Sequence, residues 1–215
     1  MKNGVNDSAI RRLPIYYRHI LVMHTAGVEF TSARILSELT GVHQTQIRKD
    51  IALTGLVGIP KKGHNVNDLI EGIKSFLNWG NIKDTVLVGA GNLGKAILKY
   101  DKFKDFGIQI VAAFDVDEEV IGKVINNIKI YSAEELQSIC IQKNIKLGII
   151  CTPPEISQKV TDELILGGIK GIWNFTQSQL NVPDEIVVET VDLYRGLGVI
   201  SKRLSEKKIQ KYKKK

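Results

Sequence analysis

The chain carries at residues 84–100 the sequence D-T-V-L-V-G-A-G-N-L-G-K-A-I-L-K-Y, in which a short β-branched run meets a glycine-rich turn and then an apolar helical pattern. This order of strand, G-x-G-x-x-G and helix is typical of a dinucleotide-binding unit. The first glycine makes the tight turn, the second lets backbone N–H groups approach a pyrophosphate, and the third lets helix and strand pack closely. The sequence therefore predicts a phosphate-binding loop made of Gly89, Ala90, Gly91, Asn92, Leu93 and Gly94.

A second apolar run, residues 108–114, ends in Asp115, which lies 21 residues after Gly94. A carboxylate at this spacing accepts hydrogen bonds from the adenosine ribose of a bound dinucleotide. It would also repel a 2′-phosphate, and the V-D-E that follows at residues 116–118 supplies no arginine to hold one. We therefore expect NADH and NAD⁺ as cofactors, in preference to the NADP forms. A glycine-rich turn that binds no ligand is the alternative.

The rest of this region alternates short apolar runs with helical patterns. Strands are predicted at residues 129–131, 147–151, 171–175 and 186–188, and helices at residues 132–141 and 156–166. The alternation predicts an α/β fold with a Rossmann-like, doubly wound parallel sheet. Ligands of such sheets lie at the carboxyl ends of the strands, so the loops after Val88, Phe114 and Cys151 are expected to line the cofactor site. This adds Cys151 and Thr152 to the predicted cofactor-binding residues.

The N-terminal region has the pattern of a helix-turn-helix followed by a hairpin. The predicted elements are a helix over residues 11–27, a second helix with Thr31 as its N-cap, a turn at residues 40–42, a third helix over residues 44–53, a hairpin over residues 55–63 and a connecting helix over residues 66–79. On the third helix, Ile47 and Ile51 mark the buried face, so Lys49 points directly away from it. Together these elements predict a winged-helix domain.

The outward face of the third helix is polar and basic, as a recognition helix requires, because such side chains bind phosphates and base edges. A solvated charged face is the alternative. The hairpin tip adds two lysines that could meet a neighbouring minor groove. The predicted residues that contact double-stranded DNA are Gln44, Thr45, Gln46, Arg48, Lys49, Lys61 and Lys62.

Charge is unevenly distributed along the 215 residues, whose formal net charge is +7. Counting Lys and Arg against Asp and Glu gives +4 for residues 1–80, −3 for residues 81–188 and +6 for residues 189–215. We take these ranges as a winged-helix domain, a nucleotide-binding domain and a C-terminal helix with a basic tail. Basic ends beside an acidic nucleotide-binding body suggest a polyanion partner for one part only.

Several classes of protein are disfavoured by composition. No apolar run approaches the ~18 residues of a membrane span, and the N-terminus lacks a signal-peptide core, so a cytoplasmic protein without a membrane partner is expected. Cys140 and Cys151 form no C-x-x-C, and the four histidines have no metal-ligand spacing, so we expect reduced thiols and no metal.

An enzyme is the less favoured interpretation. None of the histidines lies in the nucleotide-binding region, where a dehydrogenase needs a positioned acid or base. Tyr100 and Lys104 do make a Y-x-x-x-K, the spacing found in short-chain dehydrogenases, but those enzymes carry it far downstream on another helix. A nucleotide-binding domain joined to a DNA-binding domain instead suggests a sensor, in which ligand binding changes the affinity for DNA. We therefore predict no catalytic residues.

Six strings of the sequence resemble those of the redox-sensing transcriptional repressor family Rex. They are R-L-P-I-Y-Y-R (residues 12–18), I-R-K-D-I (47–51), L-V-G-A-G-N-L-G (87–94), A-A-F-D-V-D (112–117), G-I-K-G-I-W-N-F (168–175) and V-D-L (191–193). The resemblance implies a homodimer that binds operator DNA when NADH is scarce and releases it when NADH binds. NAD⁺ is compatible with DNA binding in that family.

The resemblance also implies roles for individual residues. Arg48 and Lys49 match DNA-contacting positions, the three loop glycines match the pyrophosphate loop, and Asp115 matches the ribose ligand. In the family, a tyrosine near the nicotinamide, an arginine of the first helix and an aspartate of the C-terminal helix form a switch that differs between the reduced and oxidised states. The matching residues here are Tyr100, Arg18 and Asp192.

The C-terminal segment places Leu193, Leu197, Ile200 and Leu204 on one helical stripe. Gly196 and Gly198 within it each cost roughly 1 kcal/mol relative to Ala, so the helix needs a partner. In the family this helix is exchanged between subunits and packs between the partner's two domains. The lysine-rich stretch after Ser205 is expected to be disordered.

Two regions depart from the family pattern. The wing has Pro60 where the family usually carries arginine, followed by K-K-G-H at residues 61–64. Near the nicotinamide the chain has C-T-P-P at residues 151–154 and N-F-T-Q-S at residues 174–178, which are more polar than the family's usual loops. A divergent paralogue is therefore an alternative: a DNA-binding regulator with an altered or lost nucleotide response. A small NAD-dependent oxidoreductase is the other.

Overall fold

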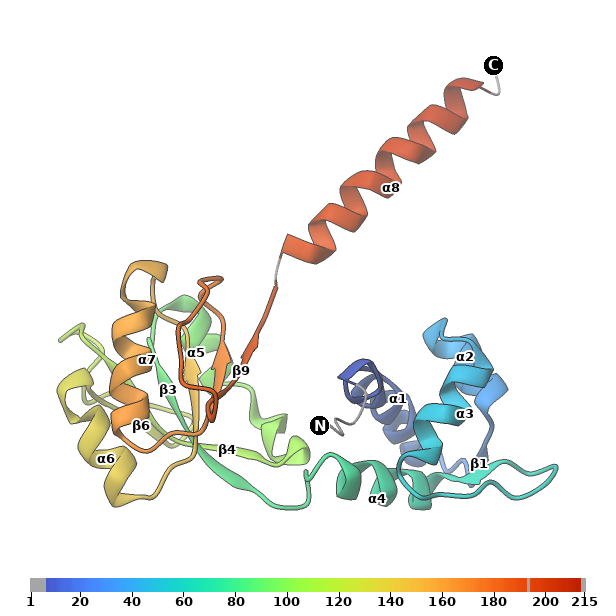
Figure 1. The fold of residues 1–215 in the computed structure, drawn as a ribbon, viewed down its shortest axis with the longest axis horizontal. Helices are drawn as coiled ribbons and strands as arrows, with labels where there is room; N and C mark the ends of the chain where they lie inside the picture. The colour runs from blue at the N-terminus through green and yellow to red at the C-terminus, as the bar shows by residue number, and fades with distance from the viewer. Residues whose placement is uncertain (1–6, 193, 214–215) are drawn as a thin grey trace. The chain divides into compact units, whose positions relative to one another are not determined.

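The computed structural model describes residues 7–192 and 194–213, the last seven of them by their backbone only. The chain divides into two compact units, whose elements are labelled in Figure 1. The first unit ends at Ile82 and also takes in Asp105–Gly107, and the second comprises Lys83–Lys104 and the chain from Ile108 onward. The division falls close to the predicted boundary at residue 80. The inclusion of residues 105–107 in the first unit is not foreseen by the sequence.

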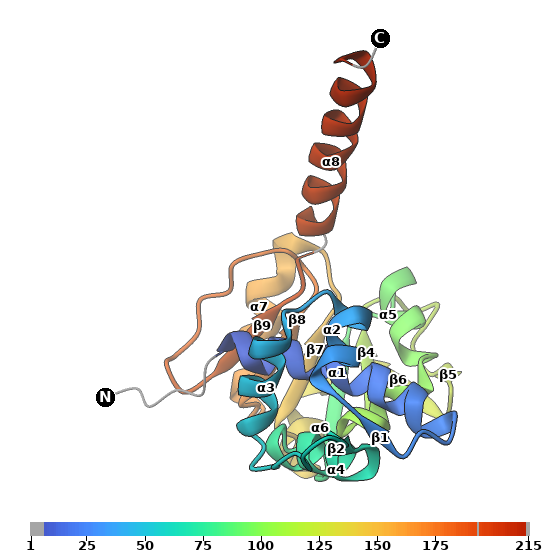
Figure 2. The same cartoon turned by 90° about the vertical axis from the view of Figure 1, so that its right-hand side faces the viewer.

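The first unit is a helix-turn-helix followed by a wing. Its described elements are α1 (Asp7–Thr25), β1 (Phe30–Thr31), α2 (Ala33–Thr40), α3 (Gln44–Ala52), β2 (His64–Asn65) and α4 (Val66–Phe76). Strands β1 and β2 pair antiparallel, beside α4 (Figure 2). A single antiparallel bridge between Ile59 and Gly63 closes the turn that carries Lys61 and Lys62, so the hairpin predicted over residues 55–63 is confined to its tip.

The predicted start of the second helix is wrong by one residue. Ser32 is the N-cap of α2, and its Oγ accepts a hydrogen bond from the Ile35 N–H at 3.3 Å. Thr31 instead pairs with His64 across β1 and β2, which takes its backbone out of the capping position. The glycine turn is as predicted: Gly41 ends α2 in the left-handed conformation, with φ at 72°, and donates to the Ser37 carbonyl.

The core of the first unit is formed by apolar side chains from all four helices, which the structure buries completely or nearly so. They include Leu13, Ile20, Leu36, Ile47, Ile51, Leu69 and Ile73. An aromatic cluster of Tyr17, Trp79 and Phe106 extends this core, with edge-to-face ring centroids 5.0 to 6.0 Å apart. Because Phe106 packs in this cluster, residues 105–107 belong with the first unit.

The second unit is built on a seven-stranded sheet. Its strands are β3 (Lys83–Val88), β4 (Ile108–Asp115), β5 (Val124–Ile125), β6 (Ile128–Ser132), β7 (Leu147–Ile150), β8 (Gly171–Asn174) and β9 (Val187–Thr190). They lie in the order β5-β6-β4-β3-β7-β8-β9. All neighbours are parallel except β5, which pairs antiparallel with β6 at one edge and was not predicted because it has only two residues. Without β5 the order is that of a doubly wound nucleotide-binding sheet, so the predicted fold class is confirmed.

Helices cover both faces of this sheet (Figure 1). The helical segments packed around the sheet are α5 (Asn92–Leu98), η2 (Ala133–Glu135), α6 (Leu136–Gln142), η3 (Pro154–Ile156) and α7 (Ser157–Leu166). The described chain also contains η1 (Asp101–Phe106), whose last two residues belong to the first unit, and α8 (Tyr194–Lys213). On β3, Val86 and Val88 pack with α6 and α7 on one face, and Leu87 packs with α5 on the other. This alternation follows from the two-residue period of a strand.

The C-terminal helix α8 is described to Lys213, and it therefore includes most of the lysine-rich stretch after Ser205 for which the sequence predicts disorder. Asp192 caps its first turn, and Lys202 pairs with Glu206 at 3.6 Å on its surface. Leu193, the first residue of the predicted apolar stripe, lies outside the described residues.

Within the described part of the chain, no helix is both long and apolar enough to cross a bilayer. The same residues contain no group of three His, Cys, Asp or Glu side chains placed to hold a metal ion. Cys140 and Cys151 are both free thiols.

Candidate functional site

The glycine loop follows β3 and shapes the carboxyl edge of the sheet. Gly89 has φ at 98°, and a Cβ there would lie 2.7 Å from the Cys151 backbone, so only glycine fits. A Cβ on Gly94 would collide with the Gly89 carbonyl oxygen, so glycine is required here for helix α5 to pack closely on strand β3. At Gly91, by contrast, no atom of the described chain lies within 4 Å of the Cβ position, apart from those of Gly91 and its two chain neighbours. The space that a phosphate would need is therefore left open at Gly91.

Asp115 ends β4 beside this loop. Its Oδ2 accepts a hydrogen bond from the Ala90 N–H at 2.5 Å, and its Oδ1 accepts from the Val116 and Asp117 N–H groups at 2.7 and 3.0 Å. The structure thus brings Asp115 and the glycine loop together, as the sequence predicts. The hydrogen bond from Ala90 shows that, besides its predicted role toward ribose, the Asp115 carboxylate stabilises the conformation of the glycine loop. A carboxylate has about four acceptor positions, so capacity for a ribose hydroxyl remains.

Cys151 and Thr152 lie against the same loop. The Cys151 N–H donates to the Val88 carbonyl at 2.8 Å, which joins the ends of β7 and β3. Burial raises the pKa of the Cys151 thiol to about 12, so the thiol is protonated at neutral pH. The Oγ1 atom of Thr152 is buried and has no hydrogen-bond partner among the residues that the structure describes. An unsatisfied buried hydroxyl beside an open phosphate loop fits a site that a ligand completes.

Tyr100 is placed differently from the other predicted cofactor residues. It follows α5, is half exposed, and packs edge to face on Phe103 with ring centroids 4.9 Å apart. Both side chains line a cavity of about 540 Å³ together with residues 108–111, at the amino end of β4. Asp115 is at the other end of that strand. Through Phe103, which packs in one cluster with Ala90 and Cys151, Tyr100 is connected to the loop side of the sheet, and its predicted contact with the cofactor stays a prediction.

The third helix of the first unit, α3, presents the face that the sequence predicts. Ile47 and Ile51 are buried, whereas Thr45, Arg48 and Lys49 are exposed. The amide oxygen of Gln44 accepts a hydrogen bond from Arg48 Nη2 at 3.1 Å, one helical turn away. Two cations and a hydroxyl thus share the outward side of this helix.

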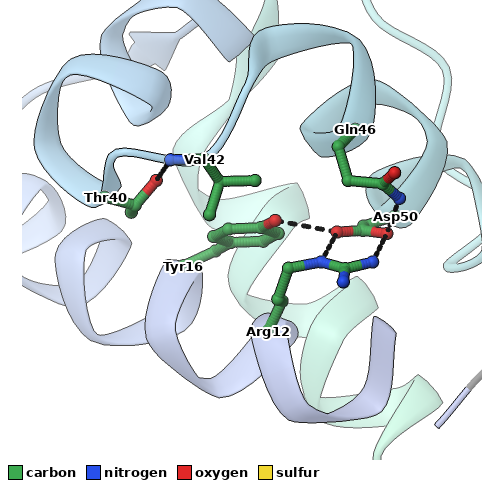
Figure 3. Close-up of polar contacts among 6 residues, drawn as sticks. All are labelled: Arg12, Tyr16, Thr40, Val42, Gln46 and Asp50. Carbon is green, nitrogen blue, oxygen red and sulfur yellow. Dashed lines mark hydrogen bonds and ion pairs between the residues drawn. The ribbon is translucent and has the colours of Figure 1, made fainter. Parts of the chain in front are cut away.

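A buried polar cluster on the inward side of α3 is not predicted from the sequence (Figure 3). Asp50 is 1% exposed and is the acceptor for three side chains. Arg12 donates to both of its oxygens at 2.7 and 2.8 Å, Tyr16 donates to Oδ2 at 2.7 Å, and Gln46 donates to Oδ1 at 2.8 Å. The signal that could have revealed it is a charged residue between Ile47 and Ile51 on the inward side of an amphipathic helix.

Electrostatics in this cluster favour the charged carboxylate. Burial alone would raise the pKa of Asp50, but the hydrogen bonds from Arg12, Tyr16 and Gln46 hold it below its usual range. Burial, and then the hydrogen bond to Asp50, raise the pKa of Tyr16, so its hydroxyl remains a donor. The cluster is a satisfied ion pair that fastens α3 to α1.

The wing brings further positive charge to the α3 side of the first unit. Lys61 has φ at 64° at the tip of the turn, and the Lys62 ammonium lies 5.2 Å from the ring centre of Phe30. A cavity of about 640 Å³ lies between the wing and the helices, and its basic lining residues are Arg34, Arg48, Lys61 and Lys62. Positive side chains from α2, α3 and the wing therefore converge on one hollow.

Arg18 and Asp192, the other predicted switch residues, belong to different units. Arg18 is exposed on α1. Asp192 Oδ1 accepts hydrogen bonds from the Tyr194 and Arg195 N–H groups, both at 2.9 Å, and so caps the first turn of α8. Capping is a role for Asp192 that the sequence analysis does not assign.

Two family models match the chain. One is described as "CoA binding domain" and matches residues 81–178, and the other is described as "Putative DNA-binding protein N-terminus" and matches residues 4–52. Among curated relatives, the redox-sensing transcriptional repressor Rex of Treponema denticola is 35% identical over 200 residues, which cover 93% of this chain and 95% of the relative.

Two similar crystal structures are of RSP. The complex with β-NADH is 34% identical, with a TM-score of 0.88, and the match covers 98% of this chain and 99% of that one. The complex with β-NAD⁺ and operator DNA is 35% identical, with a TM-score of 0.87, covering 99% and 98%.

A winged-helix unit with a basic recognition face, joined to a Rossmann unit with an open phosphate loop, defines a class of DNA-binding proteins that carry a nucleotide-binding domain. Within that class, the chain belongs to the Rex family of redox-sensing transcriptional repressors, because it matches members of that family at about 35% identity over nearly the full length of both chains. The resemblance noted in the sequence is thereby confirmed.

Proposed function

We propose that this protein is a transcriptional repressor that senses the NADH/NAD⁺ ratio, binding operator DNA when NADH is low and releasing it when NADH binds. The observation that carries the proposal is the full-length similarity to RSP, of which one structure contains β-NADH and another contains β-NAD⁺ with operator DNA. In this chain, the open loop at Gly91 and the basic face of α3 support the proposal as candidates for the two sites.

The residues around the glycine loop fit a dinucleotide. Gly91 leaves room for the pyrophosphate, and the N-terminal N–H groups of α5 are available to it. Asp115 would accept from the adenosine ribose, and the Thr152 hydroxyl would gain the partner that it lacks among the described residues. We include Cys151 as part of the wall of this site. Bound NADH would supply no chemistry here beyond occupancy, because the proposed role is sensing and not turnover.

The DNA-binding surface that we propose consists of the outward face of α3 and the wing. Thr45, Arg48 and Lys49 are exposed on this face, and Arg48 also donates a hydrogen bond to Gln44. Lys61 and Lys62 would contact the backbone beside a minor groove. Lysine lacks the planar fork of arginine, so this wing is expected to depend on charge more than on groove shape.

We infer that the active form is a homodimer in which α8 is exchanged between subunits. Tyr194, Leu197, Ile200 and Leu204 are each more than half exposed on α8 in the single chain, which leaves an apolar stripe that a second subunit would cover. In this dimer Arg18, Tyr100 and Asp192 would form contacts that differ between the NADH and NAD⁺ states. Such state-dependent contacts supply the differential energy by which a ligand shifts a population.

Transcription in a purified system tests the repressor role. With DNA from the region upstream of this protein's own gene and purified RNA polymerase, the protein should suppress transcripts, and NADH should restore them while NAD⁺ should not. The NADH concentration should stay constant throughout. Transcripts unaffected by the protein would contradict the repressor role, and consumption of NADH with an added carbonyl compound would favour an oxidoreductase.

A further inference from the structure

The orientation of the Gln46 amide is fixed by its neighbour on α3. Gln46 Nε2 donates to Asp50 Oδ1 at 2.8 Å, and Figure 3 shows the amide oxygen of Gln46 turned away from Asp50. The opposite orientation would place the amide oxygen against a carboxylate oxygen. An ionised carboxylate only accepts hydrogen bonds, so that arrangement would be repulsive. The Asp50 carboxylate therefore decides which end of the amide is free.

Asp50 itself cannot turn to relieve this constraint. Its two oxygens are held by Arg12 through paired hydrogen bonds of 2.7 and 2.8 Å, and its Oδ2 also accepts from the Tyr16 hydroxyl. Three donors from α1 thus lock the carboxylate plane, and the carboxylate in turn locks Gln46.

Gln46 lies at the border of the outward face of α3. At 100° per residue it is about 60° around the helix from Lys49, which points directly outward. It is also the third residue of α3, and the first residues of a recognition helix are those that reach base edges. Its free Oε1 is therefore a hydrogen-bond acceptor placed where base contacts occur.

We propose that Asp50 is a positioning residue that presents Gln46 Oε1 to the major groove, so that Gln46 selects a base bearing an exocyclic amino group there, adenine or cytosine, over guanine or thymine. In the major groove only adenine N6 and cytosine N4 carry donors, whereas guanine and thymine offer acceptors at the corresponding edge. This inference rests on the proposed DNA-binding function and specifies what one residue of the site recognises.

Gln44 provides a matched comparison on the same helix. Its amide oxygen is occupied by Arg48 Nη2 at 3.1 Å, so its amino group is the free end. The two glutamines are two residues apart and present opposite hydrogen-bonding groups. Substitution of each by methionine, which has a similar length and no amide, separates the contribution of Gln46 from a general effect of losing a glutamine.

The test is selection of binding sites from random double-stranded DNA by the full-length protein, followed by affinity measurements on single-base variants of the selected site. Wild type should select adenine or cytosine at one position in each half-site. Gln46→Met should lose that preference, with discrimination at this position falling roughly 2- to 12-fold, as expected for one hydrogen bond, and preferences elsewhere retained. Gln44→Met should keep the preference at that position.

Asp50→Asn tests the positioning role through a readout that lost stability alone would not produce. An asparagine amino group at the Oδ1 position would donate to the oxygen of Gln46 and turn the Gln46 amino group outward, whereas at the Oδ2 position it would leave Gln46 as in wild type. The preference for adenine or cytosine should therefore weaken, and guanine or thymine should be gained at that one position. The melting temperature and the NADH affinity of this variant report whether it is folded. If it is not folded, the base preference of Gln46→Met tests the proposal.

Three results would overturn the proposal. Gln46→Met could bind DNA with every base preference of wild type. It could lose affinity for all sequences equally, which would make Gln46 a structural residue only. Wild type could select guanine or thymine at the position that Gln46→Met relaxes. In each case DNA binding itself persists, so the proposed repressor function stands, whereas wild type that enriches no sequence would refute both.

Discussion

Arg12 and Asp50 form a two-point ion pair that joins the first and third helices across 38 residues of chain, with Nε–Oδ2 and Nη2–Oδ1 distances of 2.7 and 2.8 Å. Asp50 is almost fully buried, whereas the Arg12 side chain is 23% exposed. A carboxylate is tolerated in the core of the winged-helix unit only because its partners satisfy it. The orientation of the DNA-facing helix therefore depends on a residue of α1.

Removal of the arginine should destabilise the first unit strongly. Arg12→Ala leaves the buried carboxylate without its main partner, and we expect a loss of about 3 kcal/mol in the free energy of unfolding. Urea unfolding followed by Trp79 fluorescence, in a Trp173→Phe background, reports this unit alone. Arg34→Ala is the control, because its pair with Glu38 is exposed and should contribute at most about 0.5 kcal/mol. Equal effects of the two substitutions would contradict a structural role for the Asp50 cluster.

The same pair predicts a pH dependence. The pKa of Asp50 lies below that of an unfolded aspartate, about 3.9, so its contribution to stability is present above that pH and is lost as pH falls through the lower, folded value. In Arg12→Ala, burial dominates and the pKa should rise. The stability difference between wild type and Arg12→Ala should thus shrink when the pH is lowered from 6 to 3, measured by urea unfolding at each pH. A difference that is constant over this range would count against the ion pair.

Gly91→Ala separates folding from nucleotide binding. The Cβ would enter open space, and φ at −68° is accessible to alanine, so the melting temperature should hardly change. The methyl group would occupy the space that a pyrophosphate needs, so NADH affinity should fall at least tenfold in a fluorescence titration. Gly94→Ala should behave differently, because its Cβ would meet the Gly89 carbonyl and impair folding. Unchanged NADH affinity in Gly91→Ala would place the dinucleotide elsewhere.

Asp115→Asn should weaken the binding of NADH and reduce the preference of the protein for NADH over NADPH. Loss of a charge-assisted hydrogen bond to ribose should reduce NADH affinity by roughly tenfold or more. Loss of the negative charge should make a 2′-phosphate less unfavourable. Because Asp115 also holds the Ala90 N–H, a small fall in melting temperature is expected. Calorimetric titration with both nucleotides measures the two affinities, with Asp117→Asn as the control. An undiminished preference for NADH would remove Asp115 from the ribose site.

Arg48→Ala should weaken DNA binding and leave NADH binding intact. If the side chain contacts one phosphate, the slope of log affinity against log salt should become less steep by about 1. Anisotropy of labelled DNA over a range of salt concentrations gives this slope. Parallel losses of DNA and NADH affinity would indicate misfolding, and an unaltered slope and affinity would take Arg48 out of the interface.

Local patterns in the sequence determine most of this fold. The glycine loop, the β3 and β4 strands and the Ile47–Ile51 face of α3 are set by residues close together in the chain, so their periodicity predicts them. The N-cap of α2 is misplaced by one residue because Thr31 pairs with His64, more than thirty residues away, and no local pattern encodes that pairing.

Parts of the site that depend on distant contacts could not be predicted. From its neighbours in the sequence, Asp50 is indistinguishable from an exposed polar residue of a basic helix. Its burial depends on its partners Arg12 and Tyr16, which lie 38 and 34 residues earlier. For the same reason the sequence predicts Gln46 only as a DNA contact, whereas the structure shows its amino group bound to Asp50. The exposed stripe of α8 is visible in the sequence, but the surface that covers it belongs to another subunit in the proposed dimer.

The measurement that tests the central claim most directly is fluorescence anisotropy of the purified protein on DNA from its own upstream region, titrated separately with NADH, NAD⁺ and NADPH. We predict that NADH releases the DNA at concentrations at which NAD⁺ and NADPH have no effect. Tight, salt-sensitive binding that is indifferent to all three nucleotides would contradict redox sensing, and would mean that the polar loops at residues 151–154 and 174–178 have remade the pocket.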